Sequence, residues 1–448
     1  MAKKRYIITF KECTTGRDYA ADVLAIDAKH VQDGVNLLAA ETAPAESEVA
    51  HFEEIGACVA TLSDTDYKRV YNDKRVVEVV EDFEVFALGC CNTTAESDRN
   101  AYQEGYQDAV NDLLQALQQA APMDRLRSPF GSSANPRFFC PSGSRLVIRC
   151  EPIDQGGDEL QKLPWNIEMV RANDVWDRVT GKDVKVAIVD TGIDEDHPDL
   201  TVSGGASFVE AVGHWDDDHG HGTHCAGIAG ARNNTTGVIG VAPECSLYAV
   251  KVLSGRGSGQ LSWILGGMGW AQRNGMQVVS MSLGSNVNTP DADCVVAYQR
   301  AAQQLIDAGC IVIAAAGNNG RESNPWVGNP ARCSAFMAVA AVDRDRQLAS
   351  FSSRGPETLG PLQGVEISAP GVSINSTFRG GGYRELSGTS MACPHVSGAA
   401  ALLKQLHPTW TPDRIRSRLK ETAADLGVPG NDPEHGAGLL DCHRAVFG

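Results

Sequence analysis

Residues 184–194 read VKVAIVDTGID, a run of β-branched and small apolar residues followed by an aspartate, Asp190. The run predicts a buried strand with Asp190 at its carboxyl end. Similar apolar runs occupy residues 246–253, 277–283, 310–317, 336–342 and 364–371. Helix-like segments at 262–275 and 293–309 lie between some of these runs. The alternation predicts an α/β fold with a mostly parallel sheet covered by helices on both faces.

The chain before residue 161 has other patterns. Strand-like and helix-like runs alternate within the first ninety residues, including a helix-like run at 28–41, and predict a small α+β domain. Next come an amphipathic helix at 95–121, which could be a spacer, a lid or a docking element, and a linker rich in Pro, Ser and Gly. We therefore expect three segments, 1–88, 89–160 and 161–448.

Composition excludes several classes of partner. The formal net charge of −17 over 448 residues argues against binding to nucleic acid or to an anionic membrane. No apolar run approaches the ~18 residues that span a bilayer, and the amino terminus lacks the apolar stretch of a signal peptide. We expect cytoplasmic synthesis, with later export by a non-standard route left open. The thirteen scattered cysteines favour buried thiols in a reducing compartment over a disulfide framework.

Three polar residues stand where an α/β sheet builds its sites. Asp190 ends a strand, although an aspartate that caps a turn is an alternative interpretation. His221 lies between two glycines in DDDHGHGTHCAG (216–227), and Ser390 precedes an Ala-rich helix. A serine hydroxyl becomes a nucleophile when a histidine takes its proton, and a buried carboxylate holds that histidine in one tautomer. The three residues therefore indicate acyl transfer.

The same stretch has two other interpretations. His219, His221 and His224 with nearby carboxylates are a possible zinc arrangement, which would indicate a metal hydrolase. That interpretation leaves Ser390 unexplained, and the residues alone leave the roles of the three histidines open. Asp216 to Asp218 are expected to form a solvated turn.

The segments VAIVDTGID, HGHGTHCAGIAG and SGTSMACPHVSGAAALL resemble the three active-site signatures of the subtilisin-like serine proteases. The resemblance covers roughly 161–448. It implies a serine endopeptidase in which Ser390 is the nucleophile, His221 the general base and then acid, and Asp190 the orienting carboxylate. Asn318 and the Ser390 backbone N–H would form the oxyanion hole. The resemblance also assigns His221 alone to catalysis, with His224 as a packed structural residue and His219 as a loop residue near the site entrance. The alternatives are an inactive binding protein on the same fold and a hydrolase of non-peptide acyl substrates.

The resemblance also implies how polypeptide substrates and a metal ion bind. Ser282, Leu283 and Gly284 would form an edge strand that pairs with an extended substrate. Gly317 and Gly328 would line a roomy apolar pocket for the residue before the scissile bond. A structural Ca²⁺ would be held by the side chains of Gln161, Asp199 and Asn234 and by the carbonyls of Arg232, Thr236 and Val238. A surface turn without metal is the alternative.

Residues 1–88 resemble the propeptide of the same family, a ferredoxin-like α+β domain that acts as folding template and intramolecular inhibitor. The resemblance implies a self-processing zymogen cut between Leu88 and Gly89. Because the 89–160 segment departs from the usual direct junction, the cut could lie as late as about residue 160. Glu78, Glu81 and Asp82 are expected to cap helix amino ends on the protease surface.

Overall fold

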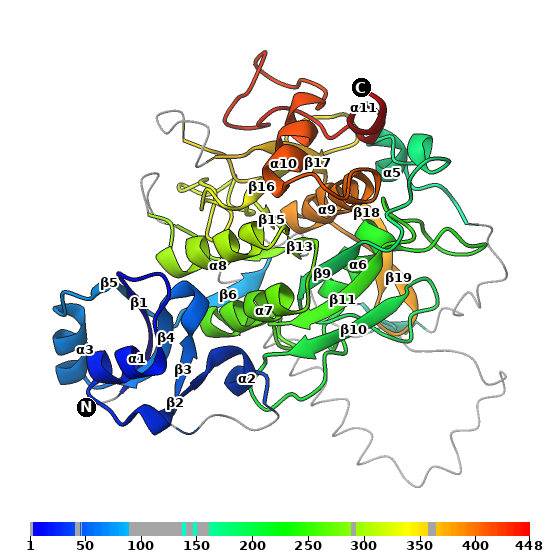
Figure 1. Ribbon diagram of the computed structural model, residues 1–448. Helices are drawn as coiled ribbons and strands as arrows, with labels where there is room; N and C mark the ends of the chain where they lie inside the picture. The colour runs from blue at the N-terminus through cyan, green and yellow to red at the C-terminus, as the bar shows by residue number, and fades with distance from the viewer. Residues whose placement is uncertain are drawn as a thin grey trace, which may run out of the picture. The chain divides into compact units, whose positions relative to one another are not determined.

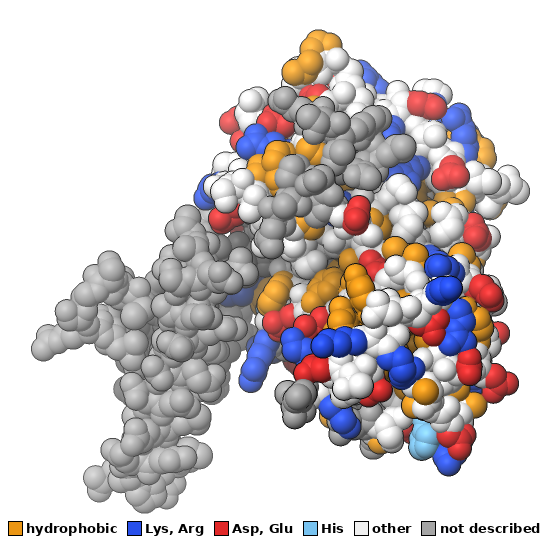
Figure 2. Space-filling model, turned by 90° about the vertical axis from the view of Figure 1, so that its left-hand side faces the viewer, with side chains coloured by type: hydrophobic (Ala, Val, Ile, Leu, Met, Phe, Trp, Pro, Cys, Tyr) orange, Lys and Arg blue, Asp and Glu red, His pale blue; other side chains and the backbone are white. Residues whose placement is uncertain are grey.

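The structure is a computed structural model that describes residues 3–40, 45, 47–88, 137–139, 147–149, 161–287, 293–356 and 364–448. Among these residues there is no helix with the length and apolarity needed to cross a membrane. On the face drawn in Figure 2, basic and acidic side chains of the described residues are interspersed, so the negative charge is spread rather than gathered there.

A seven-stranded sheet forms the centre of the catalytic region, as predicted (Figure 1). All neighbouring pairs run parallel. The strands, in spatial order, are β10 (Val202–Ser207), β11 (Ser246–Lys251), β9 (Lys185–Asp190), β13 (Val278–Met281), β15 (Ile311–Ala315), β16 (Met337–Val342) and β17 (Ile367–Pro370). The order reverses direction around β9, β11 and β13, and sites in such sheets form at the carboxyl ends of strands near such a reversal.

Helices cover both faces of this sheet. Val186 and Ile188 of β9 pack into one core with α6 (His221–Gly230) and α9 (Thr389–Leu406). Ala187 and Val189 point the other way, into a core with α7 (Leu261–Arg273) and α8 (Val296–Asp307). This alternation explains why the strand sequences are apolar throughout. The remaining elements of this region are α5 (Trp165–Met169), η4 (Asn173–Val175), α10 (Pro412–Glu421), α11 (Cys442–Phe447) and the hairpin β18 (Ile374–Phe378) and β19 (Gly382–Leu386).

The amino-terminal region is a mainly antiparallel sheet, in the order β2-β3-β4-β1-β5, with two main helices. Without β2, the strand order is that of a ferredoxin-like βαββαβ unit. Its elements are β1 (Lys4–Phe10), α1 (Arg17–Leu24), η1 (Ala28–His30), β2 (Val31–Asp33), α2 (Gly34–Leu38), β3 (Val49–Phe52), η2 (Glu53–Ile55), β4 (Ala57–Leu62), α3 (Asp64–Tyr71) and β5 (Val76–Glu81).

The helix expected at 28–41 is wrong as a single element. Asp27 accepts a hydrogen bond from Lys29 N and Asp33 accepts one from Asn36 N, so each aspartate caps its own short helix. Between the two helices, β2 is extended and pairs with β3. The local capping and the sheet pairing together outweigh the apolar spacing that suggested one helix.

One further strand, β6 (Glu84–Ala87), leaves this domain and lies between β12 (Ser258–Gln260) and β14 (Leu283–Gly284) as an antiparallel partner of both. Residues 1–89 and 161–448 form one compact unit, and residues 90–160 form another. In the second unit β7 (Arg137–Phe139) pairs antiparallel with β8 (Val147–Arg149). Gly89 and the helix predicted at 95–121 lie outside the described residues.

The expectation about cysteines is partly wrong. Six of the seven free cysteines in the described part of the chain are buried, as expected of structural thiols. Cys294 and Cys333, however, form a disulfide between positions 39 residues apart. No repeated spacing in the sequence pointed to this pair, because the fold alone brings the two positions together.

Candidate active site

Three elements carry the predicted catalytic residues to one edge of the sheet. Asp190 is the last residue of β9, His221 the first residue of α6, and Ser390 the second residue of α9. All three are buried. The backbone leading into α6 needs glycine at 220, where φ is +104°, and a Cβ at Gly222 would lie 2.1 Å from the Gly192 carbonyl oxygen.

His221 is held by the aspartate. Its Nδ1 donates to Asp190 Oδ1 at 2.7 Å, and the same oxygen accepts from Thr191 N at 2.7 Å. Burial acts to lower the pKa of His221, but the adjacent Asp190 carboxylate and its hydrogen bond outweigh burial and raise that pKa well above the ordinary value. The imidazole is therefore oriented and made more basic by one partner, as a proton acceptor requires.

The second ring nitrogen of His221 is free to accept a proton. His221 Nε2 has no hydrogen-bond partner, and the Ser390 hydroxyl donates instead to the Ser282 carbonyl oxygen at 2.9 Å. Catalytic hydrogen bonds are often long or misaligned before the reacting complex forms, so rotation of the serine side chain would be needed to engage Nε2. In this state the serine is positioned but its proton is not yet shared with the base.

The Leu88 carbonyl oxygen lies between two donors. Asn318 Nδ2 donates to it at 2.8 Å and the Ser390 backbone N–H donates to it at 3.3 Å. Asn318 Oδ1 accepts from both the backbone N–H and the hydroxyl of Thr389, at 2.9 Å each, which fixes the orientation of the amide. These are the two donors that the sequence predicted for a developing oxyanion.

The chain before Leu88 occupies the predicted substrate edge. Leu283 and Gly284 of β14 pair with Ala87 and Phe86, and the Leu88 N–H donates to the Ser282 carbonyl oxygen at 3.0 Å. On the other side, β12 pairs with β6, and the Ala87 N–H donates to Gly257 O at 2.8 Å. Sequence reasoning missed β12, because GRGSGQ has no apolar pattern and contributes only its backbone.

Gly284 of the edge strand and the two predicted pocket glycines, Gly317 and Gly328, have different surroundings. A Cβ at Gly284 would lie 3.0 Å from Leu88 Cδ1, so this glycine leaves space for the leucine side chain. A Cβ at Gly317 would instead meet Ser353 Oγ at 2.8 Å, and one at Gly328 would meet the Ser285 carbonyl oxygen at 2.3 Å. Gly317 and Gly328 thus allow close approach of neighbouring segments, and their place in the pocket stays a prediction.

The solvated turn expected at Asp216 to Asp218 is wrong for Asp217. Asp217 is buried and accepts hydrogen bonds from the backbone N–H groups of His219, Gly220 and Thr223 and from the hydroxyls of Thr191 and Thr223. Burial acts to raise the pKa of Asp217, but these hydrogen bonds lower it overall. Asp216 and Asp218 are both exposed, as expected, although Asp218 also pairs with the buried ammonium of Lys251. Asp217, through its buried hydrogen bonds, holds the loop that carries His221 in place.

The three histidines do not form a metal site. His224 is fully buried, with Nε2 3.0 Å from Ile374 O and 2.9 Å from Arg384 O, as expected of a packed residue. The one possible metal-binding group among the described residues is Asp190, His221 and Cys225. Cys225, whose proximity sequence reasoning missed, has its Sγ 3.9 Å from His221 Nδ1 and 3.5 Å from the Ser390 carbonyl oxygen.

The predicted calcium ligands are brought together. Gln161 Nε2 donates to the carbonyls of Arg232 and Val238 at 2.7 Å each, and Gln161 Oε1 accepts from Asn234 N at 3.0 Å. The buried Asp199 carboxylate accepts from Asn234 Nδ2 and Val238 N, each at 2.8 Å. Thr236 N donates to Asn234 Oδ1 at 2.9 Å. Burial raises the pKa of Asp199. One carboxylate among amide and carbonyl oxygens is a donor set that suits Ca²⁺.

A parallel α/β sheet with a buried Asp–His pair, a nearby helix-start serine and a two-donor hole defines a serine hydrolase of the acyl-transfer class. Comparison with known proteins identifies the family. The family model described as "Subtilase family" matches residues 181–438.

Three relatives are 46% identical to this chain over 64% of its length. They are a thermostable alkaline protease of Halalkalibacterium halodurans, subtilisin E of Bacillus subtilis and a subtilisin of Bacillus pumilus, of which 74%, 72% and 99% are covered. The chain belongs to the subtilase family and is a serine endopeptidase that acts on polypeptides.

Proposed function

We propose that Ser390, His221, Asp190 and Asn318 carry out peptide hydrolysis. His221 Nε2 takes the proton of the Ser390 hydroxyl as Oγ attacks the scissile carbonyl carbon, and Asp190 stabilises the imidazolium. Asn318 Nδ2 and the Ser390 N–H hold the oxyanion. The imidazolium then gives its proton to the leaving amine, and water hydrolyses the acyl-enzyme with the same groups.

We also propose that the chain is a zymogen cut between Leu88 and Gly89. The observation that carries this proposal is the Leu88 carbonyl oxygen between Asn318 Nδ2 and Ser390 N. The flanking strand β6 pairs on both sides as a bound substrate would. A carbonyl already in the hole, next to the nucleophile, is positioned for attack. Leu88 next to Gly284 supports a preference for apolar residues before the cut.

Residues 1–88 would then be the inhibitor domain, 89–160 a linker and 161–448 the enzyme. Glu78 accepts from Val296 N at 3.0 Å at the start of α8, and Asp82 accepts from Ser262 N at 2.9 Å near the start of α7. Carboxylates at helix amino ends are favourable because they meet unpaired N–H groups and the positive end of the dipole. Glu81, which we expected to do the same, pairs with Lys4 instead.

The Asp199 cluster supports a proposed structural Ca²⁺ site. Rotation of the Gln161 amide group, which exchanges the positions of its oxygen and nitrogen, would present Oε1 to the ion. An ion bound only by the folded state adds RT ln(1 + [L]/Kd) to stability, about 2.7 kcal/mol at 100 times Kd. Chelation should lower the melting temperature of the wild type and leave that of Asp199→Asn unchanged; equal melting curves for the wild type with and without calcium would contradict the site.

The test of the catalytic proposal is the Ser390→Ala variant. It should remain 448 residues long by intact mass, whereas the wild type loses its amino-terminal domain. Its activity on a polypeptide should fall by about 10⁶-fold, the loss known for subtilisins, and His221→Ala should lose about as much because the groups act as a unit. Substantial proteolysis by Ser390→Ala would overturn the assignment.

A further inference from the structure

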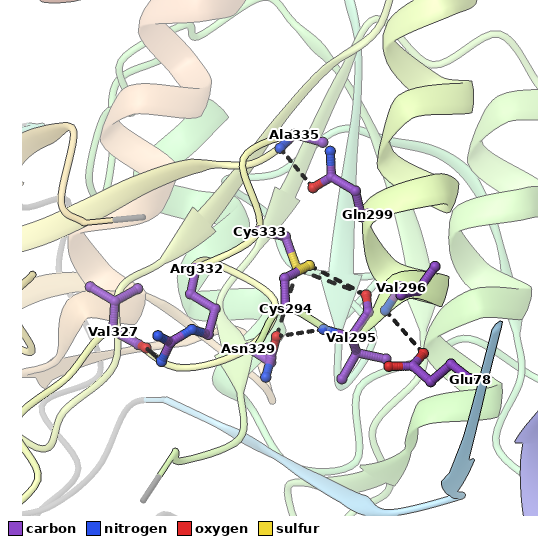
Figure 3. The surroundings of a disulfide bond; sticks show 10 residues. All are labelled: Glu78, Cys294, Val295, Val296, Gln299, Val327, Asn329, Arg332, Cys333 and Ala335. Carbon is purple, nitrogen blue, oxygen red and sulfur yellow. Dashed lines mark hydrogen bonds between the residues drawn. A yellow bond between two sulfur atoms is a disulfide. The ribbon is translucent and has the colours of Figure 1, made fainter. Parts of the chain in front are cut away.

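The disulfide lies at a junction between the substrate edge and the amino-terminal domain. Cys294 is partly exposed and stands two residues before α8, whereas Cys333 is buried. Their Cα atoms are 5.0 Å apart. Figure 3 shows Asn329 beside the sulfur pair and Glu78 reaching the backbone of Val296 on the other side. One covalent bond therefore sits between two functional contacts.

Asn329 links the disulfide to the proposed substrate pocket. Its Oδ1 lies 3.6 Å from Cys333 Sγ and accepts from Val295 N at 3.3 Å. Its backbone pairs with Ser285 in both directions, at 2.8 Å and 3.1 Å. A Cβ at Gly284 would lie 2.9 Å from the Asn329 carbonyl oxygen and 3.0 Å from Leu88 Cδ1. Asn329, which contacts Cys333 and the residue after Cys294, thus lies beside Gly284, the glycine next to the Leu88 side chain.

The second link runs to the start of α8. The disulfide fixes Cys294, and Val295 and Val296 follow directly. The N–H of Val295 is held by Asn329, and that of Val296 is the one that Glu78 accepts. Loss of the covalent bond would free the segment before this helix end, and with it the N–H group that the amino-terminal domain uses.

We propose that the Cys294–Cys333 disulfide is a redox control on this enzyme, and that the oxidised form keeps both the pocket wall and the α8 docking point in place. Reduction loosens the wall, which lowers selectivity for a large apolar residue before the cut. It also weakens the hold of the amino-terminal domain. The selectivity part rests on the proposed pocket; the docking part rests on the Glu78 contact alone.

The reductant that we propose is a dithiol. Its thiolate attacks the sulfur of Cys294, which is the partly exposed partner, and Cys333 leaves as a thiolate that takes up a proton. The second thiol of the reductant then attacks the mixed disulfide and releases Cys294 as a thiol. Two electrons pass from the dithiol, which becomes a disulfide, to the protein.

The experiment uses the full chain after self-processing, equilibrated in mixtures of reduced and oxidised dithiothreitol. Two peptides that differ only in Leu or Ala before the cut are compared by kcat/KM. We expect the Leu/Ala ratio of kcat/KM to fall about tenfold on reduction, chiefly through KM for the Leu peptide. Gain or loss of the contact made by one methylene group in an apolar pocket alters discrimination by about 10-fold or more. Alkylation and peptide mass mapping confirm that both thiols are free.

Two variants provide the controls. The double variant Cys294→Ser, Cys333→Ser should behave like the reduced enzyme and ignore the reductant. Cys442→Ala, which replaces a free cysteine that remains in the processed enzyme, should respond like the wild type. A Leu/Ala ratio that stays within about twofold when both thiols are free would overturn the selectivity link, since that difference is below the contribution of one methylene group.

A second readout separates this proposal from the pocket assignment. In full-length Ser390→Ala, reduction should speed hydrogen exchange at the N–H groups of Val295 and Val296, because opening of this segment becomes easier. If the oxidised enzyme shows no preference for Leu, the pocket assignment is wrong and the exchange rates decide the redox link. Unchanged exchange at both positions in the reduced protein would overturn it.

Discussion

The amino-terminal domain and the catalytic region are both mixtures of helix and sheet, but they are held together in different ways. The catalytic region has a parallel sheet with apolar cores on both faces. The amino-terminal domain has one small core of its own, and its other face packs Val35 and Phe52 into the α7 and α8 side. Many of its remaining contacts to the catalytic region are charged or polar.

The polar contacts are of a kind that water can replace. Arg273 pairs with Asp33 at 2.7 Å, and Arg300 donates to the carbonyls of Phe10 at 2.7 Å and Ile55 at 3.1 Å. Glu78 and Asp82 cap helices. Helix ends and arginines at a surface can be rehydrated without leaving a buried unpaired charge. These differences indicate that the catalytic region is stabilised by its own apolar cores, whereas the amino-terminal domain can dissociate from it.

Among variants that keep Ser390 and His221, the largest effect is expected in the oxyanion hole of the catalytic region. Asn318→Ala removes one of two donors to the oxyanion and should lower kcat by about 10²–10³, as in subtilisins, with little change in KM. Asn319→Ala, one residue further on, is the matched control and should retain activity. Equal rates for the two variants, measured on one peptide, would show that the donor pair is not the catalytic element.

The pH dependence should reveal the Asp190–His221 pair. Because the pKa of His221 is raised well above 6.5, the neutral imidazole that accepts the serine proton disappears at a higher pH than for an ordinary histidine. We expect kcat/KM to fall about tenfold per pH unit on the acid side, with its midpoint above the ordinary histidine pKa of about 6.5. A profile that is flat from pH 5 to 9 would contradict this base.

Asp217→Asn tests whether the loop that carries His221 is fastened as strongly as the contacts suggest. The change removes the charge that five donors share, and should cost about 2–3 kcal/mol of unfolding free energy together with a fall in kcat. Asp216→Asn, at the exposed neighbour, should stay within about 0.5 kcal/mol. Denaturant unfolding of both variants makes the comparison.

The smallest effects are expected at the boundary between the two regions. Glu78→Ala and Asp82→Ala should each weaken the hold of the amino-terminal domain by about 1 kcal/mol, or roughly fivefold in the rate of its release after cutting. Glu81→Ala is the control, because that residue pairs with Lys4 within the same domain. If Glu81→Ala speeds release as much as the other two, the helix caps are not the attachment.

Much of this fold could be predicted because its signals are local. The continuous apolar runs found six of the seven strands of the parallel sheet and missed β10, whose sequence VSGGAS has no apolar run. Residues at strand ends and helix starts marked Asp190, His221 and Ser390. The burial of Asp217 could not be predicted, since its partners include Thr191, which is 26 residues away. The cysteine pair and strand β12, which pairs through its backbone, were missed for the same reason. Each contact joins residues far apart in the sequence, and no local side-chain pattern indicates it.

Three acidic residues were expected to cap helices, and the alternation of side chains between strand faces explains why only two of them do. Glu78 and Asp82 contact α8 and α7, whereas Glu81 pairs with Lys4 of β1. A sequence pattern of acidic residues at the end of one domain gave the kind of contact correctly. Which of the three residues reach the helices depends on the register between β5 and β1.

The position of the first cut tests most directly whether the Leu88 carbonyl lies in the oxyanion hole as a substrate. The full-length wild type is allowed to process for short times, and the new amino terminus is determined by sequencing together with the masses of both fragments. We expect Gly89 as the new amino terminus and an amino-terminal fragment that ends at Leu88. A first cut near residue 160, or an uncut chain of 448 residues with full activity, would contradict the claim that the Leu88 carbonyl occupies the hole as a substrate.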